Sequence, residues 1–431
     1  MSAVIISVLV MVVLSLLRLN VVMAIIFAAL TAGWLSGMSL PDTVEVLSEG
    51  VSDQAETALS YILLGTFAVM IGYSGITGFL VRHLVQALKG KKAFVLLTIA
   101  GVASLSQNVV PVHIAFIPIL IPPLLNLFDR MKLDRRAAAV SLTFGLKAPY
   151  LLIPAGYGLI FHGIVVDEME ASGMTIGLGE VPLAMALPVL GMLIGLLFAV
   201  FVTYRKDREV NDAAQLEAEE DFKEMRFTKF HMLTIIAIIG ALLIQLSTES
   251  LVLGALTGIV LMLIFTVVPF KDADQVMVDG IKMMGMIAFV MLVASGYATI
   301  LQDTGAVDDL VTSAAGVLGN NQLLGAVAML LIGLIITMGI GSSFGTIPIL
   351  AALFVPLAAA LGFSPLATAA LIGTAGAIGD AGSPASDSTL GPTSGLNADG
   401  NHHHIWDTCV PTFLHFNIPL LAFGLLAALI F

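Results

Sequence analysis

Long, continuous apolar runs divide this chain into segments of the length that crosses a lipid bilayer. About ten stretches approach the roughly 20 residues that an α-helix needs to span a hydrocarbon core of about 30 Å. The runs are continuously apolar rather than alternating, which excludes a transmembrane β-barrel. Only 11% of the 431 residues are charged, against roughly 25% in a soluble domain. The sequence therefore predicts an all-α polytopic membrane protein.

Composition narrows the class of protein further. The formal charge of −12, without any basic patch among aromatic residues, argues against nucleic acid as a partner. The single cysteine, Cys409, excludes an internal disulfide and has no Cys/His metal-ligand spacing around it. The first apolar run, residues 4–17, has no basic segment before it and no small-residue cleavage pattern after it. We therefore expect this run to be a retained membrane helix rather than a signal peptide.

Lysine and arginine are concentrated in a few of the connecting loops. They lie at Arg18, in residues 82–92, 130–136 and 205–229, and at Lys271 and Lys282, and only Lys147 lies elsewhere. Cytoplasmic loops retain an excess of these residues, which places them inside and the acidic segments 38–57 and 166–182 outside. The resulting path crosses the cytoplasmic (inner) membrane about ten times and leaves both termini outside. The expected spans are residues 4–17, 20–37, 58–80, 137–165, 183–204, 231–247, 251–268, 283–301, 365–397 and 409–430.

Two further apolar segments, residues 94–128 and 323–361, do not fit as single spans. The first has basic loops on both sides, so it must leave the membrane by the face through which it enters. Its first arm, residues 94–106, covers only about 20 Å as a helix. This length favours a re-entrant hairpin with its tip at residues 106–108, and we place the second tip at residues 342–346. A pair of complete spans is the alternative for each segment.

Several sequence matches recur in the same order at a separation of roughly 230 residues. They pair residues 40–51 with 270–281, Gly72-Tyr73 with Gly296-Tyr297, the stretch from Ser106 with that from Ser342, and residues 137–149 with 368–380, which aligns Thr143 with Thr374. The charge pattern gives the two copies opposite orientations, so the matches indicate an inverted repeat, as in many secondary transporters. The expected units are N-terminal helices (1–37), a first repeat (38–203), a cytoplasmic linker (204–230), a helical pair (231–268), a second repeat (269–397), and a C-terminal loop and helix (398–431).

The second predicted broken helix, residues 373–395, is polar at membrane depth. A carboxylate there needs a partner, and the chain contains no lysine or arginine after Lys282. The candidate partners are a metal cation, a proton, a substrate amine, or Lys147 from the first repeat. Carboxylate, hydroxyl and carbonyl oxygens are hard ligands that suit Na⁺, and we predict Na⁺ at Asp380 and Asp387. The predicted cation-binding residues are Asp380, Asp387, Ser383, Ser386 and Thr389. Capping of the next short helix is the alternative role for Asp387.

The first predicted broken helix, residues 143–158, is interrupted by Pro149 and Pro154. It contains Lys147, the one base inside a predicted span. Lys147 is predicted to be either an ion-pair partner that releases its acid when sodium arrives, or a clamp for a substrate carboxylate. A lysine that snorkels from a cavity wall is the alternative. Lys147 and the hairpin tips form the predicted substrate site: Ser106, Gln107, Asn108, Lys147, Ser342, Ser343 and Thr346.

Three motifs resemble a known transporter family: GDAGSPASDSTLGPTSGL at residues 379–396, GSSFGTIPILAALFVPLAAALG at 341–362, and HHHIWDTCVPTFLHFNIPL at 402–420. The chain resembles the YuiF-like branch of the NhaC-type sodium/proton antiporters, within the ion-transporter superfamily. This resemblance implies a two-repeat fold with helical hairpins, often dimeric, that moves its substrate by an elevator-like displacement. It brings the hairpin tips and residues 380–393 into the site. Members include Na⁺/H⁺ antiporters and proposed amino acid transporters.

These observations favour a secondary active transporter, not an enzyme, that couples Na⁺ to the movement of a small solute such as an amino acid. A Na⁺/H⁺ antiporter is the near alternative. An intramembrane aspartyl protease is a distant one, because two aspartates from two helices would have to share a proton, and Asp380 and Asp387 lie on one segment. A passive channel is a further alternative. We expect no organic cofactor beyond the coupling ion, a homodimer, and a bilayer as the surrounding medium.

Overall fold

All elements that are described in the computed structural model are helical. The structure describes residues 3–17, 19–53, 55–76, 79, 92–108, 117, 121–208, 227–248, 250–305, 321–384 and 386–431. Within these ranges no β-strand occurs. The structure thus confirms the predicted all-α class. The tip of the first hairpin beyond residue 108 and most of the predicted linker lie outside the described residues.

The described helices follow the predicted spans to within a few residues at most boundaries. The first half contains α1 (Ala3–Leu16), α2 (Val21–Leu35), α3 (Leu40–Asp53), α4 (Ala55–Tyr73), α6 (Lys92–Asn108), α8 (Pro122–Arg130), α9 (Arg135–Leu152), α10 (Tyr157–Ala171), α11 (Val181–Phe198) and the π-helix η2 (Ala199–Thr203). The second half contains α12 (Lys229–Thr248), α13 (Leu251–Ile264), η4 (Phe270–Asp272), α14 (Ala273–Asp303), α16 (Gln322–Ile340), α17 (Ser343–Ala360), α18 (Pro365–Ala377) and α19 (Asp387–Leu396). It ends with η5 (His404–Cys409), α20 (Val410–Thr412), η6 (Phe413–Asn417) and α21 (Ile418–Ile430).

Length and apolarity together single out a subset of these helices as candidate membrane spans. Among the described residues, three helices are each long and apolar enough to cross a membrane: Val181–Thr203, Ser343–Ala360 and His404–Ile430. The bent pair α9 and α10 makes a fourth if it counts as one span. Apolar helices of 10–17 residues, such as Val22–Leu35 and Leu251–Ile264, make up much of the remainder. Short and broken helices of this kind are typical of transporters, in which irregular backbone lines an internal site.

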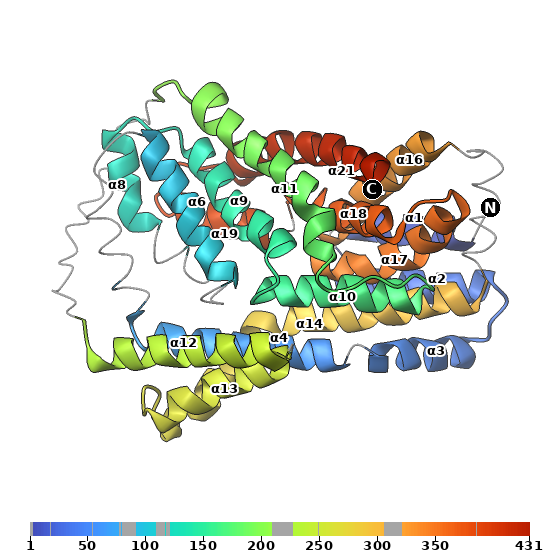
Figure 1. Cartoon of the computed structure of the whole chain (residues 1–431), viewed down its shortest axis with the longest axis horizontal. Coiled ribbons are helices and arrows are strands. Elements are labelled where there is room, and N and C mark those ends of the chain that lie inside the picture. The colour runs from blue at the N-terminus through green and yellow to red at the C-terminus, as the bar shows by residue number, and fades with distance from the viewer. Residues whose placement is uncertain are drawn as a thin grey trace.

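The helices form two groups (Figure 1). We call α2, α3, α4, α12, α13 and α14 the scaffold group, because α14 packs along α2, α3 and α4 while α12 and α13 pack on each other and α13 on α4. The hairpin group comprises α6, α8 to α11 and α16 to α21. The groups are joined through α14 against α17 and through α1, which packs on both α2 and α16. Among the described helices, α12 and α13 do not pack extensively on α6, α9 or α10.

The order of helices repeats along the chain at a constant displacement. The first residues of α6, α9 and α10 are Lys92, Arg135 and Tyr157, and those of α16, α18 and α19 are Gln322, Pro365 and Asp387. The step from residue 92 to residue 322 equals the step from 135 to 365 and from 157 to 387, and we call it the repeat displacement. The hairpins lie toward opposite ends of the molecule, with α6 and α8 on the left of Figure 1 and α16 toward the right. This arrangement is the inverted repeat that the sequence predicts.

Packing contacts fix the register of the repeat. Gly145 of α9 packs against Ala103 of α6, and Ala375 of α18 packs against Gly333 of α16. The repeat displacement carries Gly145 onto Ala375 and Ala103 onto Gly333, so the two contacts are equivalent. The sequence match aligned Thr143 with Thr374, one position beyond the repeat displacement, and was therefore out of register. Small residues recur by chance in membrane helices, so a match on Thr and Gly alone did not resolve a shift of a single position.

Proline and glycine break both helices that line the centre of the hairpin group. The α9–α10 pair bends by 50° at residues 153–156, where Ile153 is extended and Gly156 has φ +57°. In the second repeat, α18 ends at Ala377 and α19 begins at Asp387. Gly379 and Gly382 adopt φ +82° and +133° within this second break, a backbone conformation that strongly favours glycine.

The second hairpin turns at Gly341 and Ser342. Gly341 takes the left-handed conformation with φ +74°, and Ser342 caps α17 by accepting a hydrogen bond from the Gly345 amide. The tip is therefore shorter than the predicted residues 342–346, and Thr346 lies in the first turn of α17. Its Oγ1 donates a hydrogen bond to the Ser342 carbonyl. A compact turn with capped ends satisfies backbone groups that have no access to water.

Candidate functional site

Asp380 lies in the second break with its side chain fully buried. Its Oδ2 accepts a hydrogen bond from the Ser343 amide at 2.7 Å, a second from the Ser343 hydroxyl, and a third from Lys147 Nζ. Its Oδ1 accepts from the Ser386 hydroxyl. The carboxylate thus joins the tip of the second hairpin to the start of α19. Hydrogen bonds and a cationic partner are what a buried carboxylate requires.

Lys147 reaches this carboxylate from the opposite repeat. Its side chain is 8% exposed and forms a salt bridge with Asp380. Nζ also donates to the Tyr150 hydroxyl at 3.1 Å, and that hydroxyl donates to Ser343 Oγ at 2.9 Å. Of the partners that the sequence left open, the structure places Lys147 on Asp380. One charge comes from α9 and the other from the second break, so the pair links the two repeats.

The repeat makes this site asymmetric. At the repeat displacement, Tyr150 corresponds to Asp380, and Lys147 corresponds to Ala377. The first repeat therefore supplies a base and a phenol, while the second supplies an acid and a methyl group at the matching positions. A phenol hydroxyl donates and accepts hydrogen bonds and is uncharged near pH 7. The site as a whole contains a single ion pair rather than two related by symmetry.

The hydroxyl residues of the second break divide by function. Ser386 contacts the Asp380 carboxylate. Ser383 Oγ donates to the Met338 carbonyl at 3.1 Å, and Thr389 Oγ1 donates to the carbonyls of Ser383 and Ser386 at 2.5 and 2.9 Å. Ser383 and Thr389 thus direct their protons to backbone carbonyls and hold the path of the break.

The two aspartates occupy different settings. Asp380 is fully buried, whereas Asp387 is half-buried and begins α19. Ser386 is the N-cap of that helix, with its side chain accepting from the Ser388 amide. A carboxylate in the first helical turn is stabilised by the positive end of the helix dipole. Ser386 rather than Asp387 is therefore the N-cap of α19, and the predicted role of Asp387 in cation binding stays a prediction.

The hairpin tips hold the two breaks in matching ways. Asn108, at the end of α6, donates from Nδ2 to the carbonyls of Ile153 and Ala155 at 2.9 and 2.8 Å. Met338 and Ser383 make the equivalent contact in the second repeat. Ser106 Oγ donates to the Ala103 carbonyl of its own helix, and Gln107 is fully buried. Of the predicted substrate residues, the structure brings Lys147 and Ser343 onto one carboxylate, while Asn108 lies at the other break.

The three consecutive histidines have separate partners. His402 Nε2 lies 2.7 Å from Thr408 Oγ1, and His404 Nδ1 lies 2.7 Å from Thr393 Oγ1. His403 Nδ1 accepts from the amides of Ile405 and Trp406, so it caps η5. Within the described residues, no group of three His, Cys, Asp or Glu side chains has the arrangement of a metal site.

Sequence comparison places the chain in a family. The model of the "Na+/H+ antiporter family" matches residues 141–425, and that of the "Na+-H+ antiporter family" matches residues 2–88. The chain belongs to the Na⁺/H⁺ antiporter family. The first match contains both breaks and both residues of the ion pair. The resemblance drawn from the motifs at residues 341–362, 379–396 and 402–420 is thereby confirmed.

Curated relatives of this antiporter-family chain match it over its full length. A membrane protein of Vibrio parahaemolyticus is 50% identical over 442 residues, and the alignment covers 100% of each chain. A membrane protein of Haemophilus influenzae is 46% identical, with 99% of each chain covered. The Bacillus subtilis protein named "Putative amino acid transporter YuiF" is 47% identical, with 100% of each chain covered. These relatives support a multi-pass membrane protein.

Two solved structures share the fold. The YdaH transporter of Alcanivorax borkumensis matches with a TM-score of 0.61 at 14% identity, covering 90% of this chain and 88% of its own. MtrF of Neisseria gonorrhoeae also has a TM-score of 0.61, at 18% identity, with 90% and 85% covered. At such identities the likeness concerns the fold alone. It agrees with the polytopic helical architecture described above.

Sequence reasoning missed three contributors to the site. They are Tyr150, which bridges Lys147 and Ser343; Thr143, whose Oγ1 donates to the Ser388 carbonyl at 2.7 Å; and Asn417, whose Oδ1 accepts from the Gly379 amide at 3.1 Å. Tyr150 follows Lys147 at the i, i+3 spacing that puts both on one helical face, and this signal could have identified it. Asn417 lies in a distant helix and has no such signal.

Gly156 is expected to be essential for the first break. A Cβ at this position would lie 2.6 Å from the Gln107 carbonyl oxygen, and the residue has φ +57°. Gly156→Ala therefore strains the backbone and pushes the hairpin tip away. We expect the initial rate of transport in proteoliposomes to fall about tenfold or more. This fall corresponds to a rise of roughly 1.4 kcal/mol in the activation free energy.

Gly163→Ala is the matched control for this substitution. Gly163 lies in the same helix, α10, and a Cβ there meets nothing within 4 Å. We expect transport by this variant to equal that of the wild type. Equal rates for Gly156→Ala and Gly163→Ala would show that the close approach at the first break is dispensable.

Proposed function

We propose that this chain is a secondary active transporter of the cytoplasmic membrane that couples Na⁺ to the movement of a small solute. The carrying observation is the buried Lys147–Asp380 ion pair, where the tip of the second hairpin meets the second break. Burying a pair of charges at such a position costs considerable desolvation free energy. Acidic and basic groups inside a membrane commonly mark an ion pathway.

The pair provides a means of coupling. Na⁺ and the Lys147 ammonium compete for the same carboxylate oxygen, because both are cations that need Asp380. When Na⁺ replaces the ammonium, the Ser343 and Ser386 hydroxyls that already contact the carboxylate are close enough to serve as further oxygen ligands. The displaced lysine then needs a new partner. A solute carboxylate or the loss of a proton would supply one.

These two outcomes separate the proposed function from its near alternative. If the displaced ammonium takes a solute carboxylate, Na⁺ and solute move together. If it gives up its proton instead, the chain is a Na⁺/H⁺ antiporter, and the family to which it belongs favours testing this directly. The name of the Bacillus subtilis relative makes an amino acid the first solute to test.

Proteolysis receives little support from the geometry. An aspartyl protease requires two carboxyl groups that share one proton. The oxygens of Asp380 instead accept hydrogen bonds from Lys147, Ser343 and Ser386. A carboxylate that is paired with an ammonium is not available for that role.

The decisive experiment uses purified protein in liposomes with Na⁺ and pH gradients imposed separately. The readouts are a pH-sensitive dye inside the vesicles and the uptake of labelled amino acids. We expect an inward Na⁺ gradient to drive uptake against a solute gradient. Proton movement without uptake would support the antiporter alternative. If neither signal responds to either gradient, or if flux is fast and uncoupled, the transporter proposal is wrong.

Orientation and assembly are further parts of the proposal. We propose that both termini face outside, as the distribution of Lys and Arg predicts, and that the protein is a homodimer. Thiol labelling of single cysteines introduced at residues 2 and 400 in intact cells tests the orientation of the N-terminus and of the loop after α19. In the Cys409→Ser background, the two sites should react from opposite sides of the membrane. Labelling from the same side would contradict the predicted topology.

A further inference from the structure

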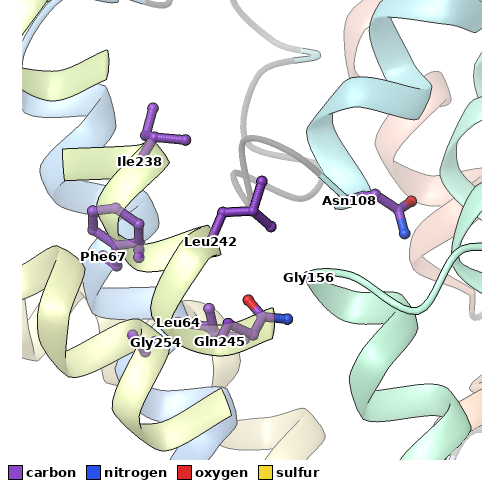
Figure 2. A pocket seen from close by; sticks show the side chains of 10 residues that line it. Leu64, Phe67, Asn108, Gly156, Ile238, Leu242, Gln245 and Gly254 are labelled. Atoms are coloured by element: carbon purple, nitrogen blue, oxygen red, sulfur yellow. The ribbon is translucent and has the colours of Figure 1, made fainter. Parts of the chain in front are cut away.

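A small cavity separates the first break from the scaffold group (Figure 2). It is lined mainly by apolar side chains such as Leu64, Phe67 and Leu242, and its volume is about 10 Å³. A cavity of this size suits a single water molecule, so this side of the first break offers a ligand little room. The polar groups that the proposed coupling leaves unused gather at the second break instead.

The C-terminal segment covers the second break. Three contacts join them: Gly379 with Asn417, Gly382 with Phe413, and Pro384 with His404. Pro384 lies two residues before Ser386, whose hydroxyl contacts the Asp380 carboxylate. A displacement of Pro384 therefore moves a group that holds the carboxylate of the ion pair.

His404 connects this break to α19. Its Nε2 lies 3.0 Å from the Pro384 carbonyl oxygen, and its Nδ1 lies 2.7 Å from Thr393 Oγ1. A carbonyl only accepts hydrogen bonds, so Nε2 must carry a hydrogen. In the neutral ring Nδ1 then has no hydrogen, and it binds Thr393 only by accepting the proton of its hydroxyl. The neutral imidazole therefore holds both partners only if Thr393 donates to it.

The hydroxyl proton of Thr393 has other acceptors. Thr393 Oγ1 also lies 2.8 Å from the Thr389 carbonyl oxygen and 2.9 Å from Thr408 Oγ1, and a hydroxyl has one proton to donate. A second proton on His404 removes this competition, because Nδ1–H then donates to Thr393 Oγ1. The charged imidazole thus allows one more hydrogen bond than the neutral imidazole does. Proton binding to His404 therefore stabilises the arrangement of the break in which the ion pair is formed.

The charges around His404 are largely paired with one another. Its element, η5, packs on α9, α19 and α20. The ionisable groups of η5, of these helices and of the adjoining break and loop are Arg135, Arg136, Lys147, Tyr150, Asp380, Asp387, Asp399, His402, His403, Asp407 and Cys409. Three of the acids are held in salt bridges: Asp380 by Lys147, Asp399 by Arg135, and Asp407 by Arg208. Cys409 Sγ lies 3.5 Å from His404 Nε2, and a thiol is a weak hydrogen-bond partner.

The other two histidines of the run differ from His404. Burial lowers the pKa of the His402 imidazole to about 4, so this ring is neutral near pH 7. His403 is exposed, and its Nδ1 accepts hydrogen bonds from backbone amides of η5. Imidazole side chains commonly change charge between about pH 5 and 8. Of the three histidines, the described contacts place His404 on the break.

We propose that His404 is a positioning residue that regulates the Na⁺ site: its charged form holds the second break in the ion-paired arrangement, and its neutral form releases the break for Na⁺. This inference rests on the proposed function and adds a proton-binding site that controls it. Low pH favours the ion pair and weakens Na⁺ binding, and this effect is lost as the pH rises and the imidazole loses its second proton.

His404→Gln tests the inference, because glutamine can donate to the Pro384 carbonyl but cannot take up a proton. Na⁺ binding is measured as stabilisation of the detergent-solubilised protein against heat at pH 6 and pH 8. From pH 8 to pH 6 we expect the half-saturating Na⁺ concentration to rise about fivefold more in the wild type than in His404→Gln. The pH response of the Lys147–Asp380 pair is common to both proteins and cancels in this comparison. Equal rises in both proteins would overturn the proposal.

Thr393→Val tests the path from His404 to α19. Valine keeps the shape of threonine and removes the hydroxyl, so the second proton on His404 gains no hydrogen bond there. We expect the same reduced pH response as in His404→Gln, and no further reduction in the double variant, since both substitutions remove one interaction. A wild-type response in Thr393→Val, or additive effects in the double variant, would contradict the proposal.

His403→Asn is the matched control. His403 is the exposed neighbour of His404, and asparagine keeps an acceptor for the η5 amides that it caps. We expect Na⁺ binding by this variant to respond to pH as in the wild type. A reduction as large as in His404→Gln would mean that the loop, rather than His404, responds to pH, and the proposal would be wrong.

Melting curves without Na⁺ keep this inference separate from the coupling proposal. Between pH 6 and pH 8 the melting temperature of the wild type should fall by roughly 2 °C more than that of His404→Gln, because the hydrogen bond of the charged imidazole is lost as the pH rises. If the wild type shows no Na⁺ response, the coupling proposal fails, and these curves still test His404. Equal falls in both proteins would refute the His404 site.

Discussion

Asp380→Asn is expected to abolish Na⁺-dependent transport, with a fall in the initial rate of about 100-fold or more, or roughly 2.7 kcal/mol in the activation free energy. Asparagine has the same shape and retains one carbonyl oxygen, but it has no charge to hold Na⁺ or the Lys147 ammonium. The measurement is the initial rate of solute uptake and of dye response in proteoliposomes, as a function of Na⁺ concentration. Asp387→Asn is the matched comparison, because Asp387 lies in the same segment at the start of α19.

Folding must be separated from coupling in this experiment. Removing one member of a buried ion pair leaves the other charge unpaired and costs about 3–5 kcal/mol. Asp380→Asn therefore also leaves the Lys147 ammonium unpaired. The double variant Asp380→Asn/Lys147→Met removes both charges and should recover the thermal stability of the wild type while remaining inactive. Sodium-dependent transport by the double variant would show that the coupling ion binds elsewhere.

The comparison with Asp387→Asn shows which of the two aspartates binds Na⁺. The structure gives Asp380 a buried setting with a lysine partner and gives Asp387 a half-buried setting in the first turn of a helix. We expect Asp387→Asn to change the Na⁺ half-saturation by less than Asp380→Asn does. If Asp387→Asn alone abolished the Na⁺ response, the ion would be bound at the start of α19. The sequence prediction includes this position, because it placed Na⁺ at both Asp380 and Asp387.

The broken helices and hairpins could be predicted because proline and glycine mark them directly. Pro149 lies in the last turn of α9 and Pro154 lies within the bend between α9 and α10, and Gly379 and Gly382 take positive φ values in the second break. These residues act through local backbone sterics, which a sequence displays without knowledge of the fold. The same holds for the long apolar spans, since bilayer thickness sets their length.

The contacts of the site were less accessible from the sequence. A hydroxyl group is common to Ser383, Ser386 and Thr389. Of these three, only Ser386 contacts the Asp380 carboxylate. The direction of a hydroxyl depends on the local path of the chain, which single-residue chemistry does not determine.

The distribution of charged residues predicted Lys147 as one of several candidate partners for the aspartates of the second repeat. The absence of Lys and Arg after Lys282 showed that a partner for the second-repeat aspartates must come from outside that half. The structure places Lys147 of α9 at that position. The response of the site to Na⁺ distinguishes its two predicted roles, releasable partner and solute clamp.

Lys147→Met is expected to lower the half-saturating Na⁺ concentration by about tenfold or more, while concentrative uptake of solute is lost. The first effect follows because Na⁺ no longer competes with the ammonium for Asp380, and a tenfold change corresponds to only about 1.4 kcal/mol. The second follows because Asp380 then keeps its cation through the whole cycle, so binding no longer drives release. Na⁺ affinity is measured by stabilisation of the detergent-solubilised protein against heat, and uptake is measured in proteoliposomes.

Lys147→Arg supplies the matched control for this variant. Arginine keeps the positive charge and cannot lose its proton under these conditions. If the lysine acts by releasing a proton, Lys147→Arg should still compete with Na⁺ but should not support proton movement. If the lysine is a clamp for a solute carboxylate, the arginine variant should retain part of the uptake, since a guanidinium binds carboxylates well. Weaker Na⁺ binding by Lys147→Met would contradict both roles, because it would mean that the ammonium assists the cation rather than competing with it.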